Sequence, residues 1–124
     1  LAEADRRVLK RLRRNIETLG AAEKCQVWCG DIPARLTGWL DAWAGRADLA
    51  LVDPPYVQAR AWSWPAVART IFAPLAGAMN DDGLVALRLP GELPPPPEVG
   101  GLEVFRLRRY GDMTVALYAG RKER

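Results

Sequence analysis

The stretch that decides the fold is Ala47–Tyr56, with the sequence ADLALVDPPY. Its first six residues, Ala47–Val52, form a nearly continuous apolar run, which is typical of a parallel strand covered on both faces. Pro54 and Pro55 end this strand abruptly, because a proline has no N–H to donate to a neighbouring strand. The sequence therefore predicts a buried strand with an acidic residue, Asp53, at its carboxyl end.

Helical and strand patterns alternate on both sides of this stretch. We expect helices over 5–19, 33–44 and 65–79, strands over 25–29, 47–52 and 84–89, a turn at 80–83, an irregular connection over 90–101, and a hairpin of 102–110 and 113–119. The alternation predicts an α/β fold with right-handed crossovers, a mostly parallel sheet and a C-terminal antiparallel hairpin. The chain fits one domain, 1–124, and Pro74 should bend or break the third helix.

Basic residues gather in two places, although the formal net charge is only +3. Six of the 18 lysines and arginines lie in 6–14, and six more lie in 106–124. Two such clusters suit a polyanion, and the simpler alternative is a solvated helix face and a charged tail. No segment approaches the roughly 20 apolar residues of a membrane span, and the start lacks a signal-peptide pattern, so we expect a cytoplasmic protein.

The chain contains no histidine. This excludes Ser-His-Asp and Cys-His catalysis and any zinc site that uses histidine. The two cysteines, Cys25 and Cys29, lie four residues apart in a predicted strand and are too far apart to form a disulfide there. We expect both to be small buried hydrophobic residues, and we expect no metal site.

Acidic residues lie at or near the carboxyl ends of three strands: Glu3, Asp31 and Asp53. Glu3 belongs to this set only if Leu1-Ala2 is the end of a strand. In open α/β sheets, ligands bind beyond these ends. The same edge of the sheet is therefore the expected binding site.

The segment Asp53-Pro54-Pro55-Tyr56 has the features of a site that methylates an exocyclic amine of a base. Such an amine is a poor nucleophile, and hydrogen bonds from its protons to the Asp53 carboxylate and the Pro54 carbonyl favour a pyramidal nitrogen. The prolines hold these acceptors in a rigid turn, and Tyr56 offers a flat face on which a base can stack. The alternative is an ordinary Asp-Pro turn at the end of a strand.

Two tryptophans, Trp62 and Trp64, follow the motif in a predicted loop. Aromatic side chains in this position are able to stack on RNA bases. Burial against the edge of the sheet is an equally good interpretation.

The chain resembles the RsmD-like family of bacterial 16S rRNA guanine-N2 methyltransferases over nearly its whole length. The matching segments are Glu3-Ala4-Asp5-Arg6 opening a helix that contains Asn15, Gly30-Asp31 after a strand, Leu51–Tyr56, and Tyr110-Gly111-Asp112 through Leu117-Tyr118. The Asp-Pro-Pro-Tyr motif is specific for amino-group methyltransferases as a class. It does not identify one substrate.

The resemblance implies a class I, Rossmann-like methyltransferase fold and S-adenosylmethionine as the cofactor. Glu3 would bind the ribose hydroxyls, Asp31 the adenine amine, and Ile32 would pack on the adenine ring. Residues 53–56 would be catalytic, with Asp53 also at the cofactor. Alternatives are a helix N-terminal acid for Glu3 and a turn or N-cap residue for Asp31, whereas Asp5 fits an N-cap. The implied partner is ribosomal RNA or the small subunit, bound by a monomer.

One part of the family pattern has no counterpart in this chain. The family has an earlier strand, followed by a glycine-rich loop around the methionine end of the cofactor. That strand would be the central one, between the strand near Glu3 and the strand that ends at Asp53. We therefore expect a gap in the sheet, and we expect these 124 residues alone to bind the cofactor poorly and to be inactive.

Two other functions remain open at this stage. The same motif occurs in adenine-N6 methyltransferases of DNA or RNA, which usually carry a separate target-recognition region. A non-catalytic Rossmann-like binding module that retains the motif is the third possibility. The absence of a glycine-rich loop from the sequence favours that last function.

Overall fold

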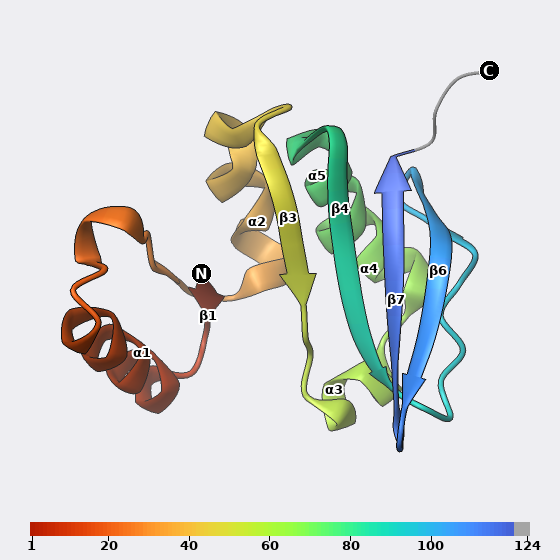
Figure 1. The fold of residues 1–124 in the computed structure, drawn as a ribbon, viewed down its shortest axis with the longest axis horizontal. Helices are drawn as coiled ribbons and strands as arrows, with labels where there is room; N and C mark the ends of the chain where they lie inside the picture. Colours follow the sequence, from red (N-terminus) through yellow and green to blue (C-terminus); the bar gives the residue numbers. More distant parts are fainter. Residues whose placement is uncertain (121–124) are drawn as a thin grey trace.

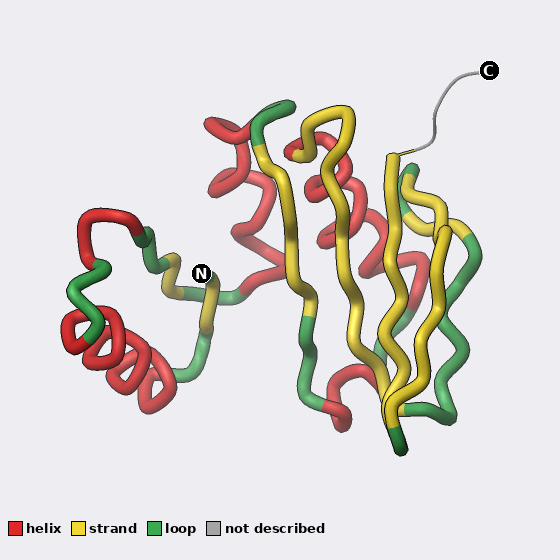
Figure 2. Tube along the Cα trace, viewed as in Figure 1, coloured by secondary structure: helices red, strands yellow, loops and turns green. Residues whose placement is uncertain are grey.

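Two sheets of unequal size carry the strands of residues 1–120, the part of the chain that the computed structural model describes. The small sheet pairs β1 (Ala2–Glu3) with β2 (Trp28–Cys29) in parallel. The larger sheet has the order β3-β4-β7-β6-β5 (Figures 1 and 2). Its strands are β3 (Ala47–Val52), β4 (Met79–Pro90), β5 (Glu98–Val99), β6 (Leu102–Tyr110) and β7 (Met113–Gly120).

The larger sheet is mixed, because β3 pairs with β4 in parallel while β7 and β6 form an antiparallel hairpin beside them. This confirms the predicted α/β class and the C-terminal hairpin. The predicted strand 25–29 is shorter than expected and comprises only β2. Residues 121–124, which contribute to the second basic cluster, lie outside the described residues.

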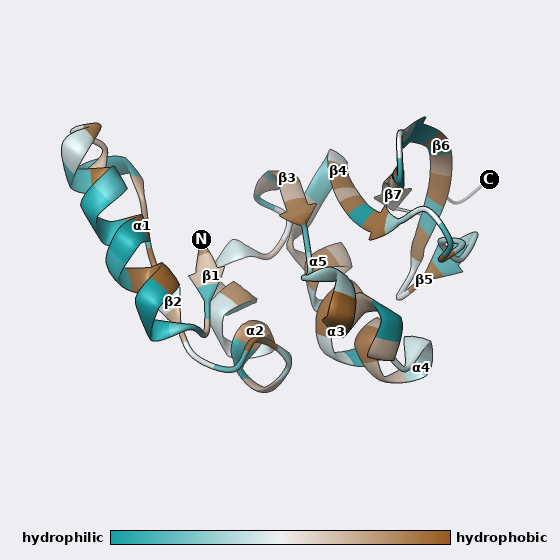
Figure 3. Cartoon of the chain, turned by 90° about the horizontal axis from the view of Figure 1, so that it is seen from below, coloured by the Kyte–Doolittle hydropathy of each residue, from teal (hydrophilic) through white to brown (hydrophobic). Residues whose placement is uncertain are grey.

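The helices that cover the larger sheet lie on one of its faces, as Figure 3 shows in a view along the strands. Helix α1 stands apart from them and begins where the Asp5 carboxylate accepts hydrogen bonds from the N–H groups of Arg7, at 2.8 Å, and Val8, at 3.2 Å. Asp5 is thus the N-cap that the sequence predicts. The helical segments are α1 (Arg6–Thr18), η1 (Ala22–Lys24), α2 (Ile32–Leu40), η2 (Asp41–Trp43), α3 (Tyr56–Ala61), α4 (Trp64–Val67), η3 (Ala68–Phe72) and α5 (Ala73–Ala78).

Pro74 changes the third predicted helix in the way expected of a proline with no N–H. Helix α4 continues into α5 through a π-helical turn, η3, in which the Ala73 N–H donates to the Ala68 carbonyl five residues earlier. Pro74 lies directly after this π-helical turn, in the first turn of α5, and has no N–H to donate to the preceding turn. The proline therefore modifies the helix without ending it.

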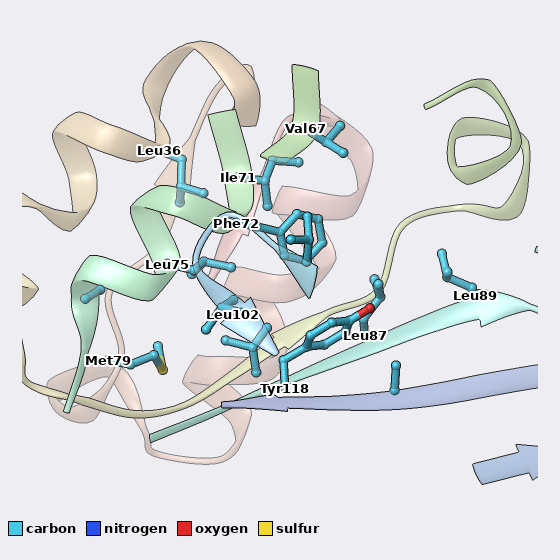
Figure 4. Packing of buried hydrophobic residues seen from close by; sticks show 14 of the residues in the cluster. Leu36, Val67, Ile71, Phe72, Leu75, Met79, Leu87, Leu89, Leu102 and Tyr118 are labelled. Atoms are coloured by element: carbon cyan, nitrogen blue, oxygen red, sulfur yellow. The ribbon is translucent and has the colours of Figure 1, made fainter. Parts of the chain in front are cut away.

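The core lies between the larger sheet and the helices on that face. Phe72, Leu87 and Tyr118 are fully buried there, and Figure 4 shows Phe72 and Tyr118 close together. The rings of these two residues have centroids 6.4 Å apart. The Tyr118 hydroxyl donates a 2.7 Å hydrogen bond to the Pro96 carbonyl, which ties the irregular segment before β5 to the core.

The opposite face of β3 is open, which corrects the prediction of a strand buried on both faces. Ala50 and Val52 are half-buried on the helix side, whereas Leu49 is 58% and Leu51 is 74% exposed. Within residues 1–120, β3 pairs only with β4, so its other edge carries no neighbour. The apolar run is typical of a covered strand, but none of the elements in residues 1–120 covers this face of β3.

The small sheet is likewise less buried than predicted. Cys29 is exposed and Cys25 is half-buried, so the expectation of two buried cysteines is wrong. The reason is that β1 and β2 belong to a sheet separate from the one that holds the core. Among residues 1–120, β1 pairs only with β2 and β3 only with β4, so no strand joins the two sheets.

The predicted turn at 80–83 is an irregular start of β4 in the structure. Five residues of β4 correspond to two of β3 there, since Ala47 pairs with Met79 and Leu49 with Leu84. Gly83 is required at this point because a Cβ atom would lie 2.9 Å from the Ala47 carbonyl oxygen. The bulge thus sets the register in which the carboxyl ends of β3 and β4 lie side by side.

Candidate active site

The Asp-Pro-Pro-Tyr motif lies where β3 ends and α3 begins. Pro54 is buried, Asp53 and Pro55 are exposed, and Tyr56 is half-buried at the start of α3. Pro55 occupies the N-cap position, and its carbonyl accepts a 2.9 Å hydrogen bond from the Ala59 N–H. The motif therefore joins the strand to the helix in a turn that both prolines restrict.

An open hollow of about 570 Å³ lies over the motif, at the carboxyl ends of β3 and β4. It is lined by all four motif residues together with three residues from β4 and the β6–β7 hairpin: Asp53, Pro54, Pro55, Tyr56, Arg88, Asp112 and Met113. The structure thus brings the four residues predicted to be catalytic to one concave surface. Asp112 and Met113 belong to the hairpin segment on which the family resemblance also rests.

Arg88 is one of three residues of this hollow that were not predicted as site residues from the sequence. Its Nε donates a 2.8 Å hydrogen bond to Oδ1 of Asp53, and its Nη1 lies 3.9 Å from Sδ of Met113. The side chains of Arg88 and Asp53 are both about half exposed. A single arginine inside the apolar run 84–89 is unusual, and this is the signal that would have found it.

Tyr56 has a partner of its own on the next turn of α3. The guanidinium carbon of Arg60 lies 5.7 Å from the centroid of the Tyr56 ring. Nε of Arg60 donates a 2.6 Å hydrogen bond to Oε1 of Glu92, in the segment after β4. This hydrogen bond is the main cause that lowers the pKa of Glu92 below its ordinary value of 4.5. The segments that follow β3 and β4 are thereby linked beside the hollow.

Glu3 ends β1, as the family resemblance implies. Its Oε1 accepts hydrogen bonds from the N–H groups of Ala4, at 3.1 Å, and Asp5, at 3.0 Å, so the carboxylate holds the turn that leads into α1. The side chain thus has a structural partner at one oxygen. Among residues 1–120, both of these hydrogen bonds use Oε1, and none is found at Oε2.

Asp31 and Ile32 follow β2, the neighbouring strand, in which Cys29 pairs with Glu3. Asp31 occupies the N-cap position of α2, but its side chain makes no capping hydrogen bond and is exposed. The carboxylate therefore does not serve as the cap that the alternative interpretation proposed. Ile32 is half-buried and packs against the core.

Carboxylates at or just after the ends of β1 and β2 are hydrogen-bond acceptors that suit a nucleoside. A carboxylate accepts hydrogen bonds from ribose hydroxyls and from an exocyclic amine, so Glu3 and Asp31 fit the ribose and adenine of S-adenosylmethionine. Asp53 belongs to the other sheet, across the gap between β1 and β3. The described residues thus fit the nucleoside end of the cofactor.

The two tryptophans after the motif are packed against the core. The ring centroids of Trp62 and Trp64 lie 6.1 and 6.2 Å from that of Phe72, and both side chains are half-buried. This arrangement favours burial over stacking on RNA. By contrast, all six basic residues of 6–14 are exposed on α1.

In residues 1–120 no group of three or more Cys, Asp and Glu side chains is arranged to hold a metal ion. In the same residues no helix has the length and apolar character needed to cross a membrane.

Residues 1–119 match the family described as Conserved hypothetical protein 95. The chain belongs to this family. It is the RsmD-like family that the sequence resembles. No curated protein matches the chain significantly in sequence.

Three solved structures are similar to this chain. A conserved hypothetical protein of Streptococcus pyogenes is 23% identical, with a TM-score of 0.68 over 98% of this chain and 70% of that chain. The Escherichia coli protein yhhF, proposed to be a methyltransferase, is 22% identical, with a TM-score of 0.68 over 99% of this chain and 64% of that chain. The rRNA methyltransferase aviRa of Streptomyces viridochromogenes is 17% identical, with a TM-score of 0.59 over 95% of this chain and 64% of that chain.

At these identities the likeness shows the fold, which is the Rossmann-like fold of methyltransferases. The chain spans 64% to 70% of the length of these three structures.

Proposed function

We propose that this chain is part of an S-adenosylmethionine-dependent methyltransferase that modifies an exocyclic amine of a nucleic-acid base. The observation that carries the proposal is that Asp53, Pro54 and Tyr56 border one hollow at the carboxyl ends of β3 and β4. A hollow at this edge is the usual ligand site of an open α/β sheet. Membership of the RsmD-like family supports the same activity.

The chemistry assigned to the motif follows from its acceptors. The Asp53 carboxylate and the Pro54 carbonyl accept hydrogen bonds from the two amine protons, which directs the nitrogen lone pair away from them. Because Pro54 is buried and Pro55 begins α3, these acceptors need little rearrangement when a base arrives. Tyr56 stacks on the ring of the base, a contact that contributes about 1–3 kcal/mol in comparable sites.

The cofactor supplies the methyl group when it is bound. In the proposed complex, Glu3 accepts from the ribose hydroxyls and Asp31 from the adenine amine, while the half-buried side chain of Ile32 borders the adenine ring. The exposed, uncapped carboxylate of Asp31 supports this assignment. Asp53 faces the cofactor as well as the base.

The proposed substrate is guanine N2 in small-subunit ribosomal RNA. The family resemblance supports this choice, and the rRNA methyltransferase aviRa has the same fold. The exposed cations of α1 are suited to contacts with phosphates. We propose that the protein acts as a monomer in the cytoplasm, where ribosomal RNA is its partner.

Methylation of ribosomal RNA by the full-length protein tests the proposal. Purified 16S rRNA and 30S particles are incubated with labelled S-adenosylmethionine, and the modified nucleotide is mapped. The expected result is a single N2-methylguanine. A methyl group on adenine N6 would support the second enzyme class, and no transfer to any nucleic acid would favour the non-catalytic module.

A further inference from the structure

The contact between Arg88 and Asp53 follows from the register of two strands. Val52 pairs with Leu87 in the parallel ladder of β3 and β4. The next residue on each strand is therefore Asp53 on β3 and Arg88 on β4, side by side at the carboxyl ends. The bulge at the start of β4 fixes this register, so the contact is built into the fold.

Strand alternation also determines the face from which Arg88 emerges. Leu87 and Leu89 are fully buried on the helix side, so Arg88 points to the opposite, open face, where it lines the hollow. Both side chains of the ion pair are about half exposed. Exposed ion pairs of this kind contribute little to stability, so the folding of the sheet does not explain this arginine.

The geometry of the pair leaves one carboxylate oxygen for a ligand. Nε of Arg88 donates a hydrogen bond to Oδ1 of Asp53. Among residues 1–120, no other hydrogen bond to this carboxylate is present. The planar guanidinium, restrained by its contact with Met113, limits rotation of the carboxylate. Oδ2 is then the oxygen presented to the hollow.

We propose that Arg88 is a positioning residue that orients Asp53 toward the amine of the target base. This inference rests on the proposed function and deepens it. Arg88 acts through Oδ1, and Oδ2 of Asp53 accepts a hydrogen bond from the N–H of the amine. Without Arg88 the carboxylate rotates freely, and the fraction of bound bases with a correctly directed lone pair falls.

The experiment compares Arg88→Ala and Arg88→Lys in the full-length protein. Arg69→Ala is the matched control, because Arg69 lies on η3, is exposed, and does not line the hollow. For Arg88→Ala we expect kcat to fall on the order of 10²-fold, with KM for RNA and for cofactor nearly unchanged. Arg88→Lys should show most of the same fall in kcat, since lysine lacks the planar guanidinium group.

Chemical rescue separates positioning from a general structural role. Added ethylguanidinium should restore part of kcat to Arg88→Ala and none to Asp53→Ala. An unchanged kcat in Arg88→Ala, or a rise in KM for RNA at constant kcat, would overturn the inference about Arg88. Methylation by the wild-type protein would still support the proposed function in that case. Absence of methylation by the wild-type protein would overturn both.

Discussion

Arg60 lies over the ring of Tyr56, with its guanidinium carbon 5.7 Å from the ring centroid, and Glu92 holds it there. Tyr56 also lines the hollow, so the ring has a charged partner on α3 and a surface that faces the site. A guanidinium packed on an aromatic ring restricts the ring and leaves less entropy to be lost when a base stacks on it. Arg60 and Glu92 thus prepare Tyr56 for the proposed role.

Removal of this partner should weaken RNA binding more than it slows methyl transfer. An exposed cation–π contact is worth about 0.5–1 kcal/mol, so Arg60→Met is expected to raise the Kd for RNA about two- to fivefold. Fluorescence anisotropy with a labelled rRNA fragment measures this change. Arg69→Met, at an exposed arginine of η3, is the control, and equal affinities of the two variants would contradict the assignment.

The pKa of Glu92 provides a second test of the same contact. The hydrogen bond from Arg60 lowers this pKa below 4.5, so the carboxylate contributes stability above pH 4.5 that is lost as pH falls through the lower, folded-state value. Carbon-detected NMR titration should show a midpoint below 4.5 that returns toward 4.5 in Arg60→Met. A midpoint that stays in place would show that Arg60 does not hold Glu92 in solution.

Tyr118 should remain neutral well into alkaline pH. Burial raises its pKa from 10.0 to about 12, and the hydroxyl donates to the Pro96 carbonyl. Because the folded-state pKa is raised, this contribution to stability is complete below pH 10.0 and is lost as pH rises toward 12. Ultraviolet titration of the wild type against Tyr118→Phe should isolate this late transition, and ionisation of Tyr118 near pH 10 would refute its burial.

The two faces of the sheet should respond differently to truncation. Leu87 is fully buried and Leu51 is 74% exposed. In the 124-residue chain, Leu87→Ala is expected to cost about 2–5 kcal/mol of unfolding free energy, whereas Leu51→Ala should change it by about 0.5 kcal/mol or less. Urea denaturation measures both values, and comparable losses would mean that the face bearing Leu51 is covered.

Local patterns in the sequence predicted the parts of the fold that local chemistry controls. Asp5 begins α1 because its carboxylate reaches the N–H groups of the first turn, and Pro74 alters its helix because it lacks an N–H. The end of β3 at Asp53 follows from the two prolines in the same way. These features depend on residues within one turn of each other.

Features that depend on distant partners were missed or wrong. Arg88 meets Asp53 only through the register of two strands 35 residues apart in sequence, and Arg60 meets Glu92 across 32 residues. Leu51 and Cys29 were expected to be buried, but both are exposed. Apolar patterns do not reveal whether another element covers a residue. Burial and pairing are properties of the assembled sheet, which composition and periodicity do not determine.

The central claim is that the Asp53 carboxylate accepts a hydrogen bond from the target amine, and one substitution tests it most directly. Methyl transfer to 16S rRNA is measured with labelled cofactor for the full-length wild type, Asp53→Ala and Asp81→Ala. Asp81 is the control because its carboxylate is exposed at the start of β4, at the opposite end of the sheet. Asp53→Ala should lose on the order of 10²–10³-fold in kcat while its circular dichroism and RNA affinity stay unchanged, and Asp81→Ala should retain full activity. Methylation by Asp53→Ala at the wild-type rate would contradict the account.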